Sequence, residues 1–354
     1  MQGHADRATE NTKRERGAEA QRAAMKKRRD LFLGLHDFTA GRGLEIGPLD
    51  AGIADPDQDD VRYVDVYDTE GIRAHYADDP NVIAELVPHV DYPLHQDGRI
   101  LSLADAAAPG APYDWVIASH VIEHVPDVIG WLQQLAAVTS DDARLLLAVP
   151  DRRYCFDRHR PPTTVGEALV AYQEGHTRPS VRAVYDFYSS VVDVSPRRLW
   201  SGARPPGRAA RMHDPQAALR HVENARSGTY VDCHVWTFTP ESLLEQVKEL
   251  RALGLCEWYV ERLQLRRGTV EFLALLRRVP PGASEAELPE PPLASDLPDW
   301  LEGEWRVRER VRELRAKLKE SRERYAALES SRSVRLSRAV LGPVRSVLRR
   351  RRRG

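Results

Sequence analysis

The sequence of 354 residues lacks the features that mark secreted and membrane proteins. Its three cysteines, Cys155, Cys233 and Cys256, are far apart and match neither a disulfide nor a zinc spacing, so we expect buried thiols. No apolar run approaches the ~18 residues of a membrane span, and the polar N-terminus does not resemble a secretory signal. These absences predict a cytoplasmic protein.

An excess of one charge is also missing, because 52 Lys and Arg residues face 53 Asp and Glu residues. The charges are unevenly distributed, since both ends are basic and residues 45–127 are rich in acids. The arginines of the C-terminal end have no aromatic stacking motif beside them. We therefore expect no nucleic-acid partner.

Apolar runs and helical periodicity alternate through the middle of the chain. Such alternation is typical of right-handed βαβ units with a parallel sheet. Two further apolar runs, separated by Arg266, Arg267 and Gly268, predict an antiparallel hairpin at the end of this region. Strands are expected at 44–46, 62–67, 113–119, 144–150, 258–265 and 269–277, and helices at 68–76, 127–138, 164–173, 215–224 and 240–253.

Composition divides the chain into segments. A charged helical extension precedes an α/β domain, and an Arg-, His- and Tyr-rich insertion interrupts that domain after its fifth strand. A Pro-rich linker, a short coiled-coil-like helix and a basic amphipathic tail follow. The expected boundaries are 1–38 for the extension, 39–278 for the domain, 151–235 for the insertion, 279–299 for the linker, 300–330 for the helix and 331–354 for the tail.

The most informative stretch is Glu45-Ile46-Gly47, an apolar run that carries an acid and ends at a glycine. Twenty residues after Glu45 comes Asp65, at the end of the next expected strand. An acid about 20 residues beyond a glycine turn is placed to bind the hydroxyls of a ribose. The pair predicts a nucleoside-binding site.

These motifs resemble those of the class I S-adenosylmethionine-dependent methyltransferases. Glu45 to Ala51 is similar to the family's first motif, and residues 114–125 closely match its fourth-strand motif. The sequence departs from the family where Leu49 and Ala51 replace the later glycines of the first motif. The resemblance implies a Rossmann-like, doubly wound, seven-stranded and mainly parallel sheet with a terminal antiparallel hairpin, a helical insertion after strand 5 and a C-terminal helix.

The resemblance also implies S-adenosyl-L-methionine as the cofactor. Asp65 would accept hydrogen bonds from the ribose, Glu45 would support the methionine end, and an acid after the third strand would contact adenine. Asp97 is the first candidate for that acid and Asp105 the second, although either residue could be an ordinary turn acid. The expected cofactor-binding residues are Glu45, Gly47, Asp65, Asp97, Asp105 and Ser119.

Catalysis is predicted at His120, just beyond the fourth strand, where the family has its active-site mouth. The alternative is a histidine that only orders the loop beneath the cofactor. His120 to His124 also spells the H-x-x-E-H pattern of some zinc peptidases, but that chemistry needs both histidines on one long helix. We expect no metal ion, and His176, His213, His221 and His234 lack the spacing of metal ligands.

The insertion begins at the carboxyl end of the fifth strand, where open α/β sheets bind ligands. Arg152, Tyr154, Asp157 and His159 are therefore expected to bind a polar or anionic acceptor. The alternative is a solvated loop joined by salt bridges.

The favoured function is methyl transfer to a hydroxyl or carboxyl of a small polar or glycan-type acceptor, with a role in bacterial polysaccharide biosynthesis. The tail at 331–354 is expected to make peripheral membrane contact, and residues 300–330 to form a homodimer. A second hypothesis is a catalytically silent cofactor-binding scaffold that dimerises and tethers partners to the membrane. A nicotinamide oxidoreductase is disfavoured by the first motif and the terminal hairpin.

Overall fold

The computed structural model describes residues 2–96, 98–201, 211–280, 282 and 319, with side chains from residue 17 onward. The chain divides into two compact units, Met1–Leu293 and Ala294–Gly354, and the account below concerns the first. The expected coiled-coil-like helix, the basic tail and nearly all of the linker lie outside the described residues and remain predictions. Within the described ranges, no helix has the length and apolar character needed to cross a membrane.

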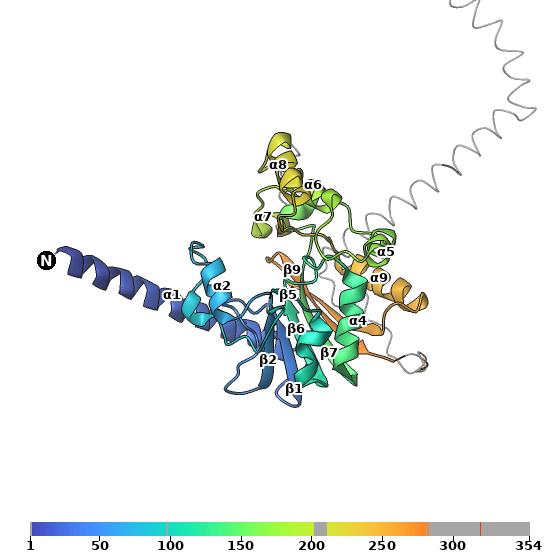
Figure 1. The fold of residues 1–354 in the computed structure, drawn as a ribbon, viewed down its shortest axis with the longest axis horizontal. Helices are drawn as coiled ribbons and strands as arrows, with labels where there is room; N and C mark the ends of the chain where they lie inside the picture. Colours follow the sequence, from blue (N-terminus) through green and yellow to red (C-terminus); the bar gives the residue numbers. More distant parts are fainter. Residues whose placement is uncertain (1, 97, 202–210, 281, 283–318, 320–354) are drawn as a thin grey trace, which may run out of the picture. The chain divides into compact units, whose positions relative to one another are not determined.

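The core is a seven-stranded sheet in the order β3-β2-β1-β6-β7-β9-β8 (Figure 1). All neighbours are parallel except β9, which runs antiparallel to both β7 and β8. The expected Rossmann-like sheet with a terminal antiparallel hairpin is thus confirmed. The strands are β1 (Arg42–Ile46), β2 (Asp60–Asp65), β3 (Tyr92–Pro93), β6 (Tyr113–Ser119), β7 (Thr139–Pro150), β8 (Trp258–Leu265) and β9 (Glu271–Arg278), and a separate small ribbon joins β4 (His95–Gln96) to β5 (Arg99–Ile100).

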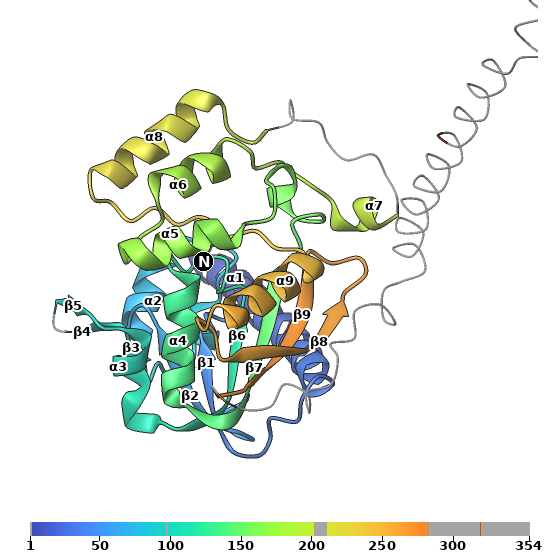
Figure 2. The ribbon, with the colours of Figure 1, turned by 90° about the vertical axis from the view of Figure 1, so that its right-hand side faces the viewer.

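Helices occur at the positions that periodicity predicted, together with three short ones, α3, α6 and α7, that it did not. The helices of the insertion lie together beyond one end of the sheet, the end at which β7 leads into Asp151 (Figures 1 and 2). The α-helices are α1 (Gln2–Leu33), α2 (Thr69–His75), α3 (Leu103–Ala107), α4 (Val128–Val138), α5 (Val165–Glu174), α6 (Val181–Tyr188), α7 (Pro196–Trp200), α8 (Pro215–Arg226) and α9 (Pro240–Ala252), and the 3-10 turns are η1 (Ala84–Leu86), η2 (Ala108–Gly110) and η3 (Phe156–His159).

The central strands bury both faces, which explains their continuous apolar sequence. Along β6, Val116 and Ala118 join the core under α4 and α9, while Trp115 and Ile117 join a second core. This alternation follows from the two-residue period of a strand. Figure 2 shows α4 and α9 on one face of the sheet and α1 behind it.

Local sequence signals fix where the main helices begin. The Asp127 side chain accepts a hydrogen bond from the Gly130 N–H at 2.9 Å and caps α4. Thr239 and Ser242 form a reciprocal capping box at the start of α9, with Pro240 in the first turn. The starting points of α4 and α9 are therefore fixed by hydrogen bonds between residues three positions apart in the sequence.

The last turns of α1 are attached to the domain by a buried ion pair. The Arg29 guanidinium donates to both carboxylate oxygens of Asp59, with Nη2 at 2.8 Å from Oδ1, and it lies 5.0 Å from the centre of the Phe38 ring. Both charged residues are less than 9% exposed. Asp59 also accepts the Asp55 N–H, so the same carboxylate orders the loop before β2.

Replacing Asp59 by Asn should therefore destabilise the protein by about 3–5 kcal/mol, because the buried Arg29 charge loses its partner. Urea unfolding measures the free energy, and hydrogen exchange should show that the end of α1 opens first. Asp57→Asn is the matched control, because Asp57 is exposed in the same loop. Equal stabilities of the two variants would contradict this role for the ion pair.

Candidate functional site

The carboxyl ends of β1 and β2 bring Gly47 and Asp65 to the same edge of the sheet. The two strands pair in parallel, with Ile46 opposite Val64, and the Gly47 N–H donates to the Val64 carbonyl at 2.9 Å. Gly47 has φ +60°, a conformation that disfavours side chains, so the chain turns sharply there. The expected pair of residues is thus adjacent in space.

Glu45 orders the turn from inside the protein. Its two carboxylate oxygens accept the N–H groups of Ile53 at 2.7 Å and Ala54 at 2.9 Å, and the residue is 1% exposed. Burial raises the pKa of Glu45 to about 7, against the opposing effect of the two hydrogen bonds. We expected Glu45 to support the methionine end of the cofactor; in the structure its side chain is used to shape the loop at 47–54.

Leu49 adopts a left-handed backbone conformation that normally favours glycine. It has φ +47°, although it stands where the resembled family has its second glycine. A left-handed conformation costs a residue with a side chain about 1–2 kcal/mol. Burial of neighbouring Pro48 and Asp50, and a hydrogen bond from the Ile83 N–H to Asp50 at 2.8 Å, hold the turn in place.

Asp65 remains available for a ligand. Its Oδ1 accepts the Val66 N–H at 2.7 Å, and this is the one hydrogen bond to its side chain among the described residues. Burial raises the pKa of Asp65 to about 6, against a lowering effect of that hydrogen bond. Two aromatic residues near this strand end were not predicted from the sequence: Tyr67, two residues after Asp65, and His95, whose ring lies 4.9 Å from that of Tyr67. The His95 N–H donates to the Val66 carbonyl, which joins them to the strand end.

Of the two candidates for the adenine-contacting acid, Asp97 and Asp105, the structure describes Asp105. Asp97 lies outside the described residues. Asp105 is in the first turn of α3, where its Oδ2 accepts the Ser102 hydroxyl at 2.7 Å and its N–H donates to the same oxygen at 3.0 Å. Asp105 thus pairs with Ser102, the N-cap of α3, whereas the alternative left open by the sequence was an ordinary turn acid.

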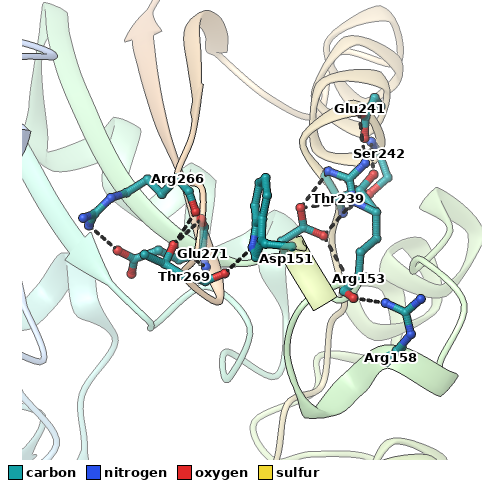
Figure 3. A network of polar contacts seen from close by, with 10 residues as sticks. Asp151, Arg153, Arg158, Thr239, Glu241, Ser242, Arg266, Thr269 and Glu271 are labelled. Carbon is teal, nitrogen blue, oxygen red and sulfur yellow. Dashed lines mark hydrogen bonds and ion pairs between the residues drawn. The ribbon is translucent and has the colours of Figure 1, made fainter. Parts of the chain in front are cut away.

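Glu271, the first residue of β9, binds several basic side chains near the carboxyl end of β6. Its carboxylate accepts from Arg28 of α1 at 2.8 and 2.9 Å and from Arg266 at 2.7 Å, and the His120 Nε2 lies 2.7 Å away. Figure 3 shows Glu271 with Arg266 and Thr269. Burial would raise the pKa of Glu271, but hydrogen bonds from His120 and Arg28 outweigh it and lower the pKa to about 2.

His120, the expected catalytic residue, is held between two carboxylates. Nε2 faces Glu271, and Nδ1 lies 3.4 Å from Oε1 of Glu123. Burial would lower the pKa of His120, but the two carboxylates outweigh it and raise the pKa to about 9. At neutral pH the imidazole therefore carries two protons and can donate but not accept one. This geometry favours the role of ordering the loop over that of a general base.

Ser119, an expected cofactor-binding residue, contacts the N-terminal helix α1. Its hydroxyl oxygen accepts from Nη2 of Arg28 at 2.8 Å, the same guanidinium that binds Glu271. The end of β6 is thereby tied to α1, a contact between residues 91 positions apart. The expected cofactor-binding role of Ser119 stays a prediction.

The start of the insertion is anchored by a second carboxylate. Asp151, 1% exposed, binds the Arg153 guanidinium, which also approaches Glu241 of α9 at 3.4 Å (Figure 3). The Asp151 N–H donates to the Val270 carbonyl at 2.7 Å. This network fixes the direction in which the chain leaves β7.

The four expected acceptor-binding residues fall into two pairs. Tyr154 stacks on Trp200 at 4.1 Å between ring centres, and Asp157 is 1% exposed and paired with Arg160 at 2.9 Å. These two side chains are packed inside the insertion, which argues against direct contact with an acceptor. Arg152 and His159 each have a buried nitrogen, Nε and Nε2, with no hydrogen-bond partner in the described part of the protein. They remain the better candidates.

Folding also brings together residues that sequence analysis kept apart. Glu123, His124 and His234 each present a potential ligand atom, and these atoms all lie within 4.8 Å of one another. We had expected His234 to be no ligand because it has no ligand-like spacing in the sequence. The sequence shows only two of the three residues together, because Glu123 and His124 are consecutive and His234 lies 110 positions after His124.

Comparison with known proteins gives the family. Residues 17–250, more than half of the chain, match a family model described as a methyltransferase domain. No curated protein matches the sequence.

Several solved structures are similar at low identity. Magnesium protoporphyrin IX methyltransferase from Synechocystis PCC 6803, with bound SAH, is 12% identical, covers 74% of this chain and 86% of its own, and has a TM-score of 0.32. The CcbJ methyltransferase from Streptomyces caelestis is 13% identical, with coverage of 75% and 90% and a TM-score of 0.34. An S-adenosylmethionine-dependent methyltransferase from Mesorhizobium loti is 12% identical, with coverage of 70% and 96% and a TM-score of 0.35.

Because these TM-scores are below 0.5, the family assignment rests on the match of residues 17–250 to the family model. The strand order of the sheet agrees with that match. The chain therefore belongs to the methyltransferase domain family, and it is a class I S-adenosylmethionine-dependent methyltransferase.

Proposed function

We propose that the turn at Gly47 and the carboxylate of Asp65 bind the adenosyl part of S-adenosyl-L-methionine. The observation that carries the proposal is the adjacency of these two residues at the carboxyl edge of the sheet, with Asp65 half-buried and one of its oxygens free of described contacts. A ribose diol can donate two hydrogen bonds to such a carboxylate. The cofactor has no phosphate, so a glycine-rich phosphate loop is unnecessary.

The acceptor is proposed to be a hydroxyl or carboxyl on a small polar or glycan-type molecule. Support comes from the start of the insertion, which leaves the carboxyl end of β7 and carries Arg152 and His159, each with one buried nitrogen that has no hydrogen-bond partner among the described residues. Donors of this kind bind oxygen-rich molecules. A role in bacterial polysaccharide biosynthesis fits the same chemistry.

The second candidate is a silent cofactor-binding scaffold. It is favoured by His120, which at neutral pH is protonated and so offers no base for a hydroxyl acceptor. Dimerisation through residues 300–330 and membrane attachment through 331–354 would then be the main activities. Transfer of a labelled methyl group to metabolites or glycans of a cell extract decides between an enzyme and this scaffold.

Calorimetric titration tests the cofactor proposal. The wild-type protein should bind S-adenosylmethionine and its demethylated product, and it should not bind NAD. Asp65→Ala should lower the affinity for both sulfur compounds at least about 100-fold, because two charge-assisted hydrogen bonds of about 1.5–3 kcal/mol each are lost.

The matched control is Asp60→Ala, at the opposite end of the same strand, where Asp60 is exposed and pairs with Arg42 and Arg62. This variant should bind like the wild type. Binding of NAD alone, or equal losses in the two variants, would refute the proposed site.

Binding of the cofactor should also depend on pH through Asp65. Its pKa is raised to about 6 in the folded protein, so the carboxylate that accepts the ribose hydroxyls is lost as pH falls through 6. The affinity should therefore decrease about tenfold between pH 7.5 and pH 5. In Asp65→Asn the affinity should be weak and should lack this step, which separates Asp65 from the titration of Glu45. A step that persists in Asp65→Asn would assign the effect to another group.

Membrane attachment is tested by sedimentation with liposomes that contain anionic lipid. The segment at 331–354 has nine arginines and no acidic residue, and each cation near an anionic surface contributes about 1 kcal/mol. The full chain should sediment with these liposomes at low salt, and a chain ending at residue 330 should not. Equal sedimentation of both chains would exclude the tail as the anchor.

A further inference from the structure

Glu123 is a buried carboxylate without a hydrogen bond. The residue is 1% exposed, and neither of its carboxylate oxygens has a hydrogen-bond partner among the described residues. Two imidazoles are near, with Nδ1 of His120 at 3.4 Å and Nε2 of His234 at 4.0 Å from Oε1. The second separation is too long for a hydrogen bond. A buried carboxyl group with no hydrogen bond and one long contact to an imidazole is poorly compensated, which points to a missing partner.

The two histidines of the cluster are oriented by other carboxylates. Nδ1 of His234 lies 2.5 Å from Oδ2 of Asp157, and Nδ1 of His124 lies 2.9 Å from Oδ1 of Asp232. Each contact engages Nδ1 and leaves Nε2 for another partner. A histidine that binds a metal ion through one nitrogen commonly donates the other N–H to a carboxylate.

We propose that Glu123, His124 and His234 bind one divalent transition-metal cation. Two imidazoles and one carboxylate are a ligand set typical of Zn²⁺ and of related ions, and Mg²⁺ prefers sites made of oxygen. Two atoms bonded to one such ion at tetrahedral angles lie about 3.4 Å apart, so separations of up to 4.8 Å require the ligand side chains to close in by as much as about 1.4 Å on binding. This proposal departs from the expectation, drawn from the sequence, that the protein holds no metal ion.

The positive groups nearby do not remove the need for a cation. Arg160 donates to Asp157 at 2.9 Å and to the carbonyls of His234 and Val235, and its contacts are thereby directed away from Glu123. His120 directs Nε2 to Glu271 at 2.7 Å, and its Nδ1 lies 3.4 Å from Oε1 of Glu123. This long contact with the His120 imidazolium is the metal-free partner of Glu123, and it is the competing outcome in the experiment below.

The position of the cluster connects it to the reaction edge of the sheet. Glu123 and His124 follow β6 by four and five residues, and His124 keeps 31% of its side chain exposed, so the site is open on that side. Three protein ligands leave a coordination position for water or for an oxygen of another molecule. If the proposed methyl transfer to a hydroxyl or carboxyl holds, that oxygen belongs to the acceptor.

The experiment measures binding of Zn²⁺ alone to the full chain, prepared without a histidine tag and freed of metal by a chelator. Competition with a chromophoric chelator gives the affinity, and elemental analysis after dialysis gives the stoichiometry. We expect one Zn²⁺ per chain, an increase of the melting temperature on binding, and no comparable effect of Mg²⁺. Neither measurement requires cofactor or methyl transfer, so failure here is distinct from failure of the proposed function.

Three variants make the result specific. Glu123→Gln should lower the Zn²⁺ affinity more than 100-fold and should abolish the thermal stabilisation by Zn²⁺. Asp232→Asn keeps all three ligands and should lower the affinity about 10–100-fold, because it removes the group that orients His124. His176→Gln is the control, since His176 pairs with Glu174 at 2.8 Å away from the cluster, and it should bind Zn²⁺ like the wild type.

Circular dichroism confirms that each variant is folded. Absence of stoichiometric Zn²⁺ binding, or equal affinities of Glu123→Gln and the wild type, would overturn the proposal and leave His120 as the partner of Glu123.

Discussion

The carboxyl edge of the sheet is assembled around the buried charge of Glu271. This carboxylate at the start of β9 binds Arg28 of α1 and Arg266 of the hairpin and holds His120 at the end of β6. An unpaired carboxylate at 4% exposure would be strongly unfavourable, so the three cationic groups and Glu271 must be ordered together. The N-terminal helix is thereby part of the site edge as well as part of the second core.

The turn after β1 shows how a shared backbone shape can be kept with different residues. Gly47 supplies one left-handed position at no steric cost, and Leu49 occupies another in spite of its side chain. The loop that follows is fixed from inside by Glu45, which accepts two consecutive backbone N–H groups. The Glu45 carboxylate therefore helps to hold this turn in place, at a position where the resembled family has further glycines.

The insertion serves two physical roles at once. Its first residues are locked to the sheet and to α9 through Asp151 and Arg153. Its interior pairs Asp157 with Arg160 and His234, which brings the end of the insertion back to the loop after β6. Backbone bonds from Val235 and Trp236 to the Glu123 carbonyl, at 2.7 and 3.1 Å, close the same contact. The geometry around Glu123 thus depends on the insertion being folded.

The sequence by itself determined most elements of the domain. Period and capping are short-range signals, so β6, α4, α9 and the hairpin could be predicted from neighbouring residues. The spacing of Glu45 and Asp65 placed them on two consecutive strands, β1 and β2, where the cofactor is proposed to bind. The roles of individual polar side chains could not, because their partners are distant in the chain. Arg28 and Glu271 are separated by 243 positions and His234 and Asp157 by 77. Only tertiary packing decided that Glu45 points into a loop, that Asp157 is internal, and that Glu123 meets two histidines.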